Sequence, residues 1–514
     1  MKKYGINNIK FKVSHISFCI LYSALLYIVY NAVNFEKTAK WFYLNNEFDY
    51  IGISAFYIAG LCISIAVFTL LAHRWTIKPL AIIIIILSGA SAYFIAKYNV
   101  AIDHHMIKNA INTDTTEVRG LLSVQMIPYI LFLMVLPTMA ILFLQVTFAG
   151  SVKYLFQSVT IFVLALIIAI GLLYAQFDPI HRAANMSKKY IFHQLIPLNH
   201  ITSIINIIHN YVKTYIPEKD KKHINVSAHT STQDDLVVVL AVGESARQKN
   251  FSLYGYTRNI TNPILSKDKN LHMLNGVATF GSTLYALPEI LVKEDVPLPT
   301  ITKEAGINTA CYVHFSLYDN CGTVEQIKVT NCGHDGRCYD EDVIPLLTDN
   351  LQSYTSGYRF IVLHLGGGSH GPNYQKRYPP EFQRFHPMCL DADVVNQCTV
   401  DELYNSYDNT ILYTDYVLAK IINTLDNSGA PYVFIYISDH GESLMENDRV
   451  FHGMPPGIPL PPEQKYVPLI VKSSIPLSII ERQEYRQPDV FDTILDLLSV
   501  ESNITGKEGS FLKK

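Results

Sequence analysis

Charged residues are scarce in this chain, and neither sign is in excess. Asp, Glu, Lys and Arg make up 17% of its 514 residues, against about a quarter in an average soluble protein. The 41 basic and 44 acidic side chains nearly cancel, so no surplus of positive charge remains to bind a nucleic-acid backbone. No long run of one sign marks a charged tail. The composition therefore predicts no nucleic-acid partner and an apolar environment for part of the chain.

Five stretches lack Asp, Glu, Lys and Arg altogether. A membrane-spanning helix needs about 20 apolar residues, and each of the five approaches or exceeds that length. A single soluble core would not bury five such runs within so short a part of the chain, since all of them end before residue 178. We therefore predict five transmembrane helices, at residues 16–33, 50–72, 79–96, 121–146 and 154–177.

The basic residues that flank these stretches predict their orientation. Lys and Arg favour the cytoplasmic side in short flanking loops, and they precede the first stretch and lie between stretches two and three and between four and five. The first stretch lacks a small-residue cleavage site and is expected to remain as an anchor. This orientation predicts a multi-pass membrane protein, with everything after Phe177 outside the cytoplasm.

Cysteine usage independently indicates that the part of the chain after Phe177 lies outside the cytoplasm. Cys19 and Cys62 lie inside predicted spans, where a thiol behaves as a small apolar group. The other six fall in close pairs, which favours disulfides in an oxidising compartment. A zinc knuckle is the alternative, but no C-x2-C spacing occurs. We expect the disulfides Cys311–Cys321, Cys332–Cys338 and Cys389–Cys398.

The composition changes twice after the last apolar stretch, which predicts three domains: a membrane domain at 1–178, a connector at 179–233 and a catalytic domain at 234–514. The connector contains the amphipathic sequence ITSIINIIHNYVKTYI, which suits either a helix lying at the membrane surface or a helix packed on the soluble domain. From residue 235, short apolar strands alternate with helical segments, which predicts an α/β/α sandwich with a mostly parallel sheet.

Polar residues follow three strands of that sheet. The apolar segments at 236–242, 360–365 and 432–438 end in Gly243-Glu244, in a glycine run before His370, and in Asp439-His440. Open α/β sheets place their functional sites at the carboxyl ends of the strands, so we expect these side chains to converge. His452 lies 12 residues after His440, close enough to return to the same place. Two carboxylates and an imidazole suit zinc or manganese.

A candidate nucleophile occurs in the segment FGSTLYALPEI at 280–290. A hydroxyl at the start of a helix lies where backbone N–H groups stabilise a phosphoryl oxygen, although Ser and Thr are also ordinary N-caps. From the residues alone, Ser282 and Thr283 remain equal candidates. Isolated histidines elsewhere, among them His104 and His105, are interpreted as ordinary polar side chains.

Several longer motifs occur together in this chain: VVVLAVGESARQKNFSLYGYTRN, SHGPNYQKRYP, NSYDNTILYTD, SDHGESLMEN and DHHMIKNAINTDTTE. With the five spans and the α/β domain, they resemble the phosphoethanolamine transferases of the Gram-negative envelope, the family that includes the mobile colistin-resistance enzymes. The resemblance covers nearly the whole chain. It implies a five-helix membrane domain joined to a soluble domain of the alkaline phosphatase and sulfatase type.

The resemblance also implies roles for individual residues. Zinc, as one ion or two, would be held by Glu244, Thr283, Asp439 and His440, with Thr283 as nucleophile. His370 and His452 would bind phosphate or a second metal, and Asn109, Thr113 and Glu117 would face the lipid substrate. The sequence departs from the family at Thr279 and Glu289, where cysteines of a disulfide are expected.

The implied reaction moves phosphoethanolamine from phosphatidylethanolamine through Thr283 to lipopolysaccharide, by a monomeric enzyme. Acceptors compatible with the sequence are a lipid A phosphate, a Kdo or heptose of the core, or a protein glycan. Alternative functions are a phosphoglycerol transferase, a phosphohydrolase and a non-enzymatic membrane sensor with a degenerate domain.

Overall fold

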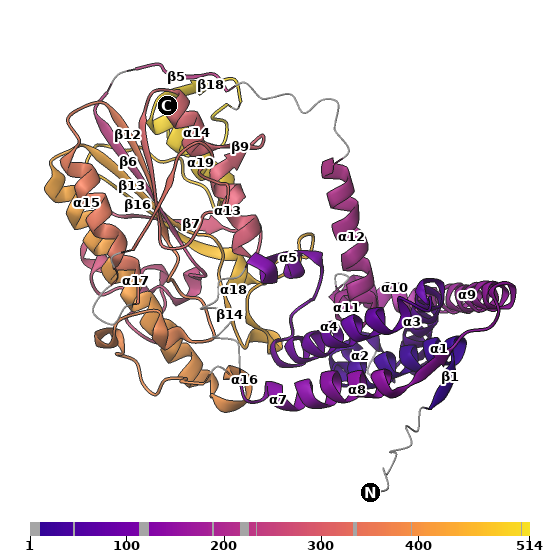
Figure 1. Cartoon of the computed structure of the whole chain (residues 1–514). Coiled ribbons are helices and arrows are strands. Elements are labelled where there is room, and N and C mark those ends of the chain that lie inside the picture. The colour runs from indigo at the N-terminus through magenta and orange to yellow at the C-terminus, as the bar shows by residue number, and fades with distance from the viewer. Residues whose placement is uncertain are drawn as a thin grey trace, which may run out of the picture. The chain divides into compact units, whose positions relative to one another are not determined.

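A computed structural model of the chain describes residues 11–44, 47–112, 123–187, 190–215, 226–232, 234–330, 332, 337–391, 393–504 and 506–513. The described residues form two compact units, one from residue 11 to 215 and one from residue 226 to 513 (Figure 1).

Apolar helices make up most of the first unit. Four of them are long and apolar enough to cross a bilayer: α3 (Tyr50–Leu71), α4 (Ile77–Tyr98), the continuous run of α7 (Met126–Tyr129), η3 (Ile130–Val135) and α8 (Leu136–Phe143), and α9 (Ser151–Ala175). A fifth apolar segment consists of two helical pieces, His15–Tyr30 and Phe35–Phe42, bent by 82°. These pieces contain α1 (His15–Leu25), η1 (Leu26–Tyr30), α2 (Phe35–Ala39) and η2 (Lys40–Phe42). Counting the bent pair once, the described residues hold up to five spans, in agreement with the prediction.

Local signals in the sequence set the ends of these helices. The Asp49 carboxylate accepts a hydrogen bond from the Gly52 N–H at 2.7 Å and caps the start of α3. Asn99 adopts a left-handed conformation, with φ at 52°, and ends α4. Both are ordinary terminators of α-helices.

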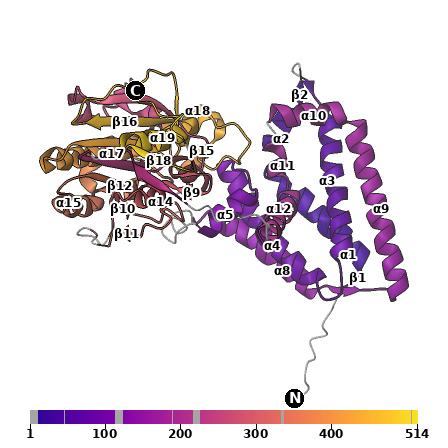
Figure 2. The same ribbon diagram turned by 90° about the horizontal axis from the view of Figure 1, so that it is seen from above.

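Small residues bring α3 and α9 together (Figure 2). Ala59, Cys62 and Ala66 of α3 form one apolar cluster with Ala165 and Ala169 of α9. Small side chains allow the helix backbones to approach closely, which is how helices associate in a bilayer.

The region predicted as a connector continues this unit with α10 (Phe177–Met186), α11 (Tyr190–Gln194) and α12 (Leu198–Tyr215). The amphipathic sequence forms α12, which packs against α4 and against α5 (His104–Asn112).

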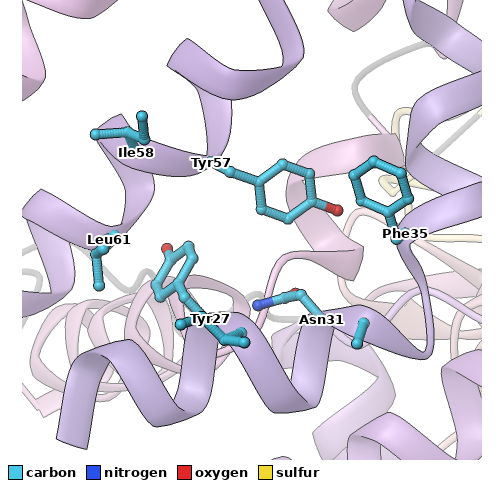
Figure 3. Close-up of a pocket in the computed structure, with 8 residues that line it drawn as sticks. Tyr27, Asn31, Phe35, Tyr57, Ile58 and Leu61 are labelled. Carbon is cyan, nitrogen blue, oxygen red and sulfur yellow. The ribbon is translucent and has the colours of Figure 1, made fainter. Parts of the chain in front are cut away.

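A cavity of about 490 Å³ lies in the first unit between the α1–α2 region and α3. Apolar groups form nearly all of its wall, and the Tyr27 and Tyr57 rings face it (Figure 3). The lining residues are Tyr27, Ile28, Asn31, Ala32, Phe35, Tyr57, Ile58 and Leu61.

An eight-stranded sheet forms the centre of the second unit. Its order is β11 (Gln326–Lys328), β10 (Asn308–Val313), β12 (Tyr358–Leu365), β6 (Leu236–Gly243), β13 (Tyr432–Ser438), β16 (Tyr466–Ser473), β7 (His272–Val277) and β17 (Tyr485–Arg486). The first five strands run parallel, whereas β16 is antiparallel to both of its neighbours. The central strands end at one edge of the sheet, as predicted, because Gly243 of β6 pairs with Leu365 of β12 and with Ser438 of β13.

Helices cover both faces of the sheet. Every residue of β6 is buried, because its side chains alternate between two covered faces. One face packs against α13 (Thr283–Leu291), α14 (Leu298–Glu304) and α19 (Gln487–Leu497), whose apolar residues join the main core. On the other face lie α15 (Ile344–Gln352) and α17 (Val400–Ser428) (Figure 1). This is the predicted α/β/α sandwich.

Local disulfides connect the cysteines of the second unit. The structure pairs Cys311 with Cys321, Cys332 with Cys338, and Cys389 with Cys398. Cys19 and Cys62 are buried free thiols in the first unit.

Candidate active site

The carboxyl ends of β6 and β13 bring three polar side chains together. Glu244 follows β6, Asp439 and His440 follow β13, and all three are at least nine-tenths buried. His440 Nε2 lies 3.6 Å from Glu244 Oε1 and 3.2 Å from Asp439 Oδ2. Residues almost 200 positions apart therefore meet because their strands are neighbours.

Thr283 joins this cluster from the start of α13. Its hydroxyl donates to Glu244 Oε2 at 3.0 Å and lies 3.4 Å from His440 Nε2. Ser282 precedes it as the N-cap residue, without a side-chain capping bond. Of the two hydroxyls that the sequence offers, the structure places that of Thr283 among the carboxylates and the imidazole.

The surrounding hydrogen bonds orient these groups toward a common point. The backbone N–H groups of Ser245 and His440 donate to Asp439 Oδ1 at 3.0 and 2.7 Å. Asp439 Oδ2 is buried and has no hydrogen-bond partner. His440 Nδ1 lies 3.0 Å from the Gly441 carbonyl oxygen, so the ring donates there and leaves Nε2 as an acceptor.

This donor set fits a divalent metal ion. A buried carboxylate oxygen without a partner carries a free-energy cost, and a cation among Glu244, Thr283, Asp439 and His440 would remove it. Two carboxylates, one imidazole nitrogen and one hydroxyl are oxygen and nitrogen donors of the kind that bind zinc. These are the four residues that the family resemblance implies for zinc, with His370 and His452 implied for phosphate or a second metal.

Ser245 holds Glu244 from the adjacent position. Its hydroxyl donates to Glu244 Oε1 at 2.7 Å. Its φ of 56° is left-handed, a conformation that non-glycine residues avoid. Such strain is found where the surrounding structure holds a functional site in place.

His370 and His452 lie beside the same cluster. The ring centroid of His452 is 4.3 Å from that of His440 and 4.6 Å from that of His370. One potential ligand atom from each of Glu244, His370 and His452 lies within 4.8 Å of the others. The structure thus brings together all six candidate site residues of the second unit.

Glu442 is a site residue that the sequence analysis missed. Its carboxylate is fully buried, accepts from the Gly371 N–H at 3.0 Å and from the Tyr374 hydroxyl, and lies 3.2 Å from His452 Nδ1. Burial raises the pKa of Glu442, and the charge of His370 and these hydrogen bonds offset part of that rise. Its position three residues after Asp439 was the available signal.

Gln487 connects the two segments that carry the cluster. Its side-chain oxygen accepts from the Thr279 N–H at 3.1 Å, and its nitrogen donates to the carbonyl oxygens of Ser438 and Asp439 at 3.3 and 2.5 Å. Gln487 is fully buried at the start of α19. This bridge begins at Thr279, one of the two positions where the family resemblance implies a cysteine.

The lipid-facing residues proposed from the sequence are not placed. Thr113, Glu117 and the side chain of Asn109 lie outside the described residues; the Asn109 backbone belongs to α5.

The mostly parallel sheet gathers carboxylates, imidazoles and a helix-terminal hydroxyl at one edge. The same chain has helices long enough to span a bilayer. Together these features define a membrane enzyme of the sulfatase type. Comparisons with known proteins identify the class further. Residues 237–500 match the family described as "Sulfatase", and residues 60–212 match "Phosphoethanolamine transferase EptA/EptB".

Individual relatives match over most of the chain. It is 31% identical over 482 residues to phosphoethanolamine transferase EptA of Escherichia coli (strain K12), covering 85% of each chain. It is also 31% identical over 517 residues to EptA of Helicobacter pylori, covering 93% of this chain and 92% of the relative. The structure of the integral membrane protein lipooligosaccharide phosphoethanolamine transferase A from Neisseria meningitidis superimposes with a TM-score of 0.86 at 25% identity, covering 98% and 99% of the two chains. This chain belongs to the phosphoethanolamine transferase family and is a transferase of that class.

Proposed function

We propose that this enzyme transfers phosphoethanolamine from phosphatidylethanolamine to lipid A or a core sugar of lipopolysaccharide, through a covalent intermediate on Thr283. The observation that carries the proposal is the position of the Thr283 hydroxyl, at the first residue of α13 and 3.0 Å from a Glu244 carboxylate oxygen. We further propose that Glu244, Thr283, Asp439 and His440 hold a zinc ion there.

The donor supplies its phosphoryl group in the first displacement. Bound zinc would lower the pKa of the Thr283 hydroxyl and neutralise charge on a phosphoryl oxygen. Thr283 Oγ1 loses its proton and attacks phosphorus, and the bond from phosphorus to the diacylglycerol oxygen breaks. That oxygen takes a proton from His370 or His452, and the proton lost by Thr283 replaces it, since imidazole titrates near neutral pH.

The acceptor reverses the roles in the second displacement. An oxygen of the acceptor attacks the same phosphorus, the bond to Thr283 Oγ1 breaks, and Thr283 recovers its proton. The start of α13 favours negative charge at this point, since backbone N–H groups of a first helical turn have no partner in the helix.

The first unit supports lipid substrates. Its helices are long enough to span a bilayer, and its apolar cavity has a volume within the range of ligand pockets. A hydrocarbon chain of the donor fits an apolar wall of this kind. We propose Asn109, Thr113 and Glu117 as contacts of the lipid headgroup.

We propose a monomer of the inner membrane whose second unit is the periplasmic catalytic domain, with boundaries at 1–178, 179–233 and 234–514. The added ethanolamine carries a positive charge. Its transfer would lower the negative charge of the cell surface and weaken the binding of cationic peptides such as polymyxins.

Replacement of the nucleophile tests the central step. Thr283→Ala should lower transfer by about 10³-fold or more, because the covalent route is lost. The measurement is mass spectrometry of lipid A and core after incubation with labelled phosphatidylethanolamine. With donor alone, the wild-type peptide that contains Thr283 should carry phosphoethanolamine.

Ser282→Ala is the matched control, since it removes the adjacent hydroxyl and leaves Thr283 in place. It should retain transfer and the modified peptide. Full transfer by Thr283→Ala, or a modified peptide in that variant, would refute the role of Thr283. The identity of the modified glycolipid distinguishes lipid A from core acceptors.

Metal removal tests the cofactor. Dialysis of the purified enzyme against EDTA should abolish transfer, and stoichiometric zinc should restore it, because Thr283 is a weak nucleophile without a bound cation. Transfer that persists in a chain shown to be free of metal would contradict the zinc proposal.

A further inference from the structure

Two imidazoles and a carboxylate gather in the first unit, where α5 begins. Asp103, His104 and His105 form the start of this helix, and His193 lies in α11. The Ile102 N–H donates to the His193 carbonyl oxygen at 3.2 Å. The backbone thus joins the two elements directly beside these side chains.

The side chains of the helix start are close enough to share one ion. Ligand atoms of Asp103, His104 and His105 all lie within 4.8 Å of one another. The two imidazole rings have centroids 3.8 Å apart. Tetrahedral zinc with bonds of 2.0–2.1 Å needs ligand atoms about 3.4 Å apart, which rotation of these side chains supplies.

Asp103 is held in position for such a role. Its side chain is buried, with 4% exposed. The Met106 N–H donates to Oδ1 at 2.8 Å, and this helix cap uses one of the two carboxylate oxygens. The orientation of ligands by a hydrogen bond of this kind is general in metal sites.

We propose that Asp103, His104 and His105 bind a zinc ion in the membrane unit, at a site formed by other residues than those of the candidate active site. Two imidazoles and one carboxylate are a zinc donor set. Three protein ligands leave the fourth position of a tetrahedral shell open to water or another group. The proposal departs from the sequence interpretation of His104 and His105 as ordinary polar side chains.

The proposed zinc would fix the first turn of α5. The helix continues from this turn to Asn112, which Thr113 and, four residues later, Glu117 follow in the sequence. Zinc at this position would therefore limit the motion of the segment that leads into the proposed headgroup contacts.

The test is the zinc content of the full-length chain in detergent, stripped with EDTA, reloaded with zinc and measured by mass spectrometry of the metal. His104→Ala/His105→Ala should hold one zinc fewer per chain than wild type. Asp439→Asn/His440→Ala, which removes active-site ligands, should retain one zinc that disappears when the two pairs of substitutions are combined.

Two further measurements separate lost ligands from lost folding. The thermal unfolding of the EDTA-treated His104→Ala/His105→Ala chain should match that of EDTA-treated wild type. His73→Ala, an exposed histidine between α3 and α4, should bind like wild type. Equal zinc in wild type and His104→Ala/His105→Ala would overturn the proposal, as would a metal-free Asp439→Asn/His440→Ala chain.

Discussion

Single hydrogen bonds orient the imidazoles of the candidate active site. His440 donates from Nδ1 to the Gly441 carbonyl oxygen, which directs Nε2 to Thr283 and the carboxylates. Glu442 Oε2 lies at the corresponding nitrogen of His452. A ring held at one nitrogen presents the other one as an acceptor. Glu442 is in this sense a positioning residue, which acts through His452.

Glu442→Gln preserves the shape of the side chain but changes the hydrogen bond that orients His452. The Gln side chain keeps an acceptor for Tyr374 and the Gly371 N–H, yet it turns a donor toward His452 Nδ1. The opposite tautomer of His452 is then favoured. We expect kcat to fall by about 10- to 100-fold, with a shifted pH profile, measured in transfer assays across pH.

Glu481→Gln removes an exposed carboxylate of the same unit and serves as its control, with unchanged kinetics. An unaltered rate and pH profile in Glu442→Gln would show that Glu442 only fills space.

Helix α19 connects the segment before Thr283 to the carboxyl end of β13. Its first residue, Gln487, bonds both to Thr279 and to the carbonyls of Ser438 and Asp439. The helix also packs against α13, which begins at Thr283. A non-covalent bridge therefore runs between the elements that must keep Thr283 near Asp439.

Gln487→Leu removes this bridge at similar volume. Buried groups left without partners cost about 1–3 kcal/mol each, so we expect the free energy of unfolding to fall by about 2 kcal/mol or more. Transfer should slow by about tenfold, because Thr283 loses its alignment. Denaturant unfolding and transfer kinetics measure the two effects.

Gln487→Glu should lower stability at least as much at neutral pH, since it keeps the acceptor for Thr279 but turns a buried carboxylate oxygen toward the carbonyl oxygens of Ser438 and Asp439. Gln483→Leu, an exposed glutamine four residues earlier, should change neither quantity. Wild-type stability in Gln487→Leu would contradict the bridging role.

At the scale of the whole molecule, the two units have different surroundings. The second unit holds three disulfides, which persist in oxidising compartments. Large apolar side chains remain exposed along the spanning helices of the first unit, among them Phe132, Phe143, Phe156 and Ile170. Exposure of so much apolar surface to water is unfavourable, whereas the hydrocarbon of a lipid bilayer solvates it.

Cysteine labelling in intact cells tests the proposed sidedness. A membrane-impermeant maleimide should label Asn427→Cys, at the exposed end of α17, and should leave Arg74→Cys, in the exposed loop between α3 and α4, unlabelled until the membrane is broken. The opposite pattern would place the catalytic unit in the cytosol. Equal labelling in broken membranes is the control for accessibility.

Much of this organisation is determined by the sequence alone. Uninterrupted apolar runs define the spanning helices, because a helix in lipid satisfies its own backbone. The buried strands at 236–243 and 432–438 are likewise evident, since a strand covered on both faces is apolar throughout. Polar residues at their ends then indicate Glu244, Asp439 and His440 before any coordinates are known.

Only the tertiary structure shows that the Thr283 hydroxyl, and not that of Ser282, bonds to Glu244, because this depends on how α13 is placed against the sheet edge. It also assigned Glu442 and Gln487, whose partners come from distant segments of the chain. Local patterns report the environment along one element, whereas these contacts depend on which elements become neighbours when the whole chain folds.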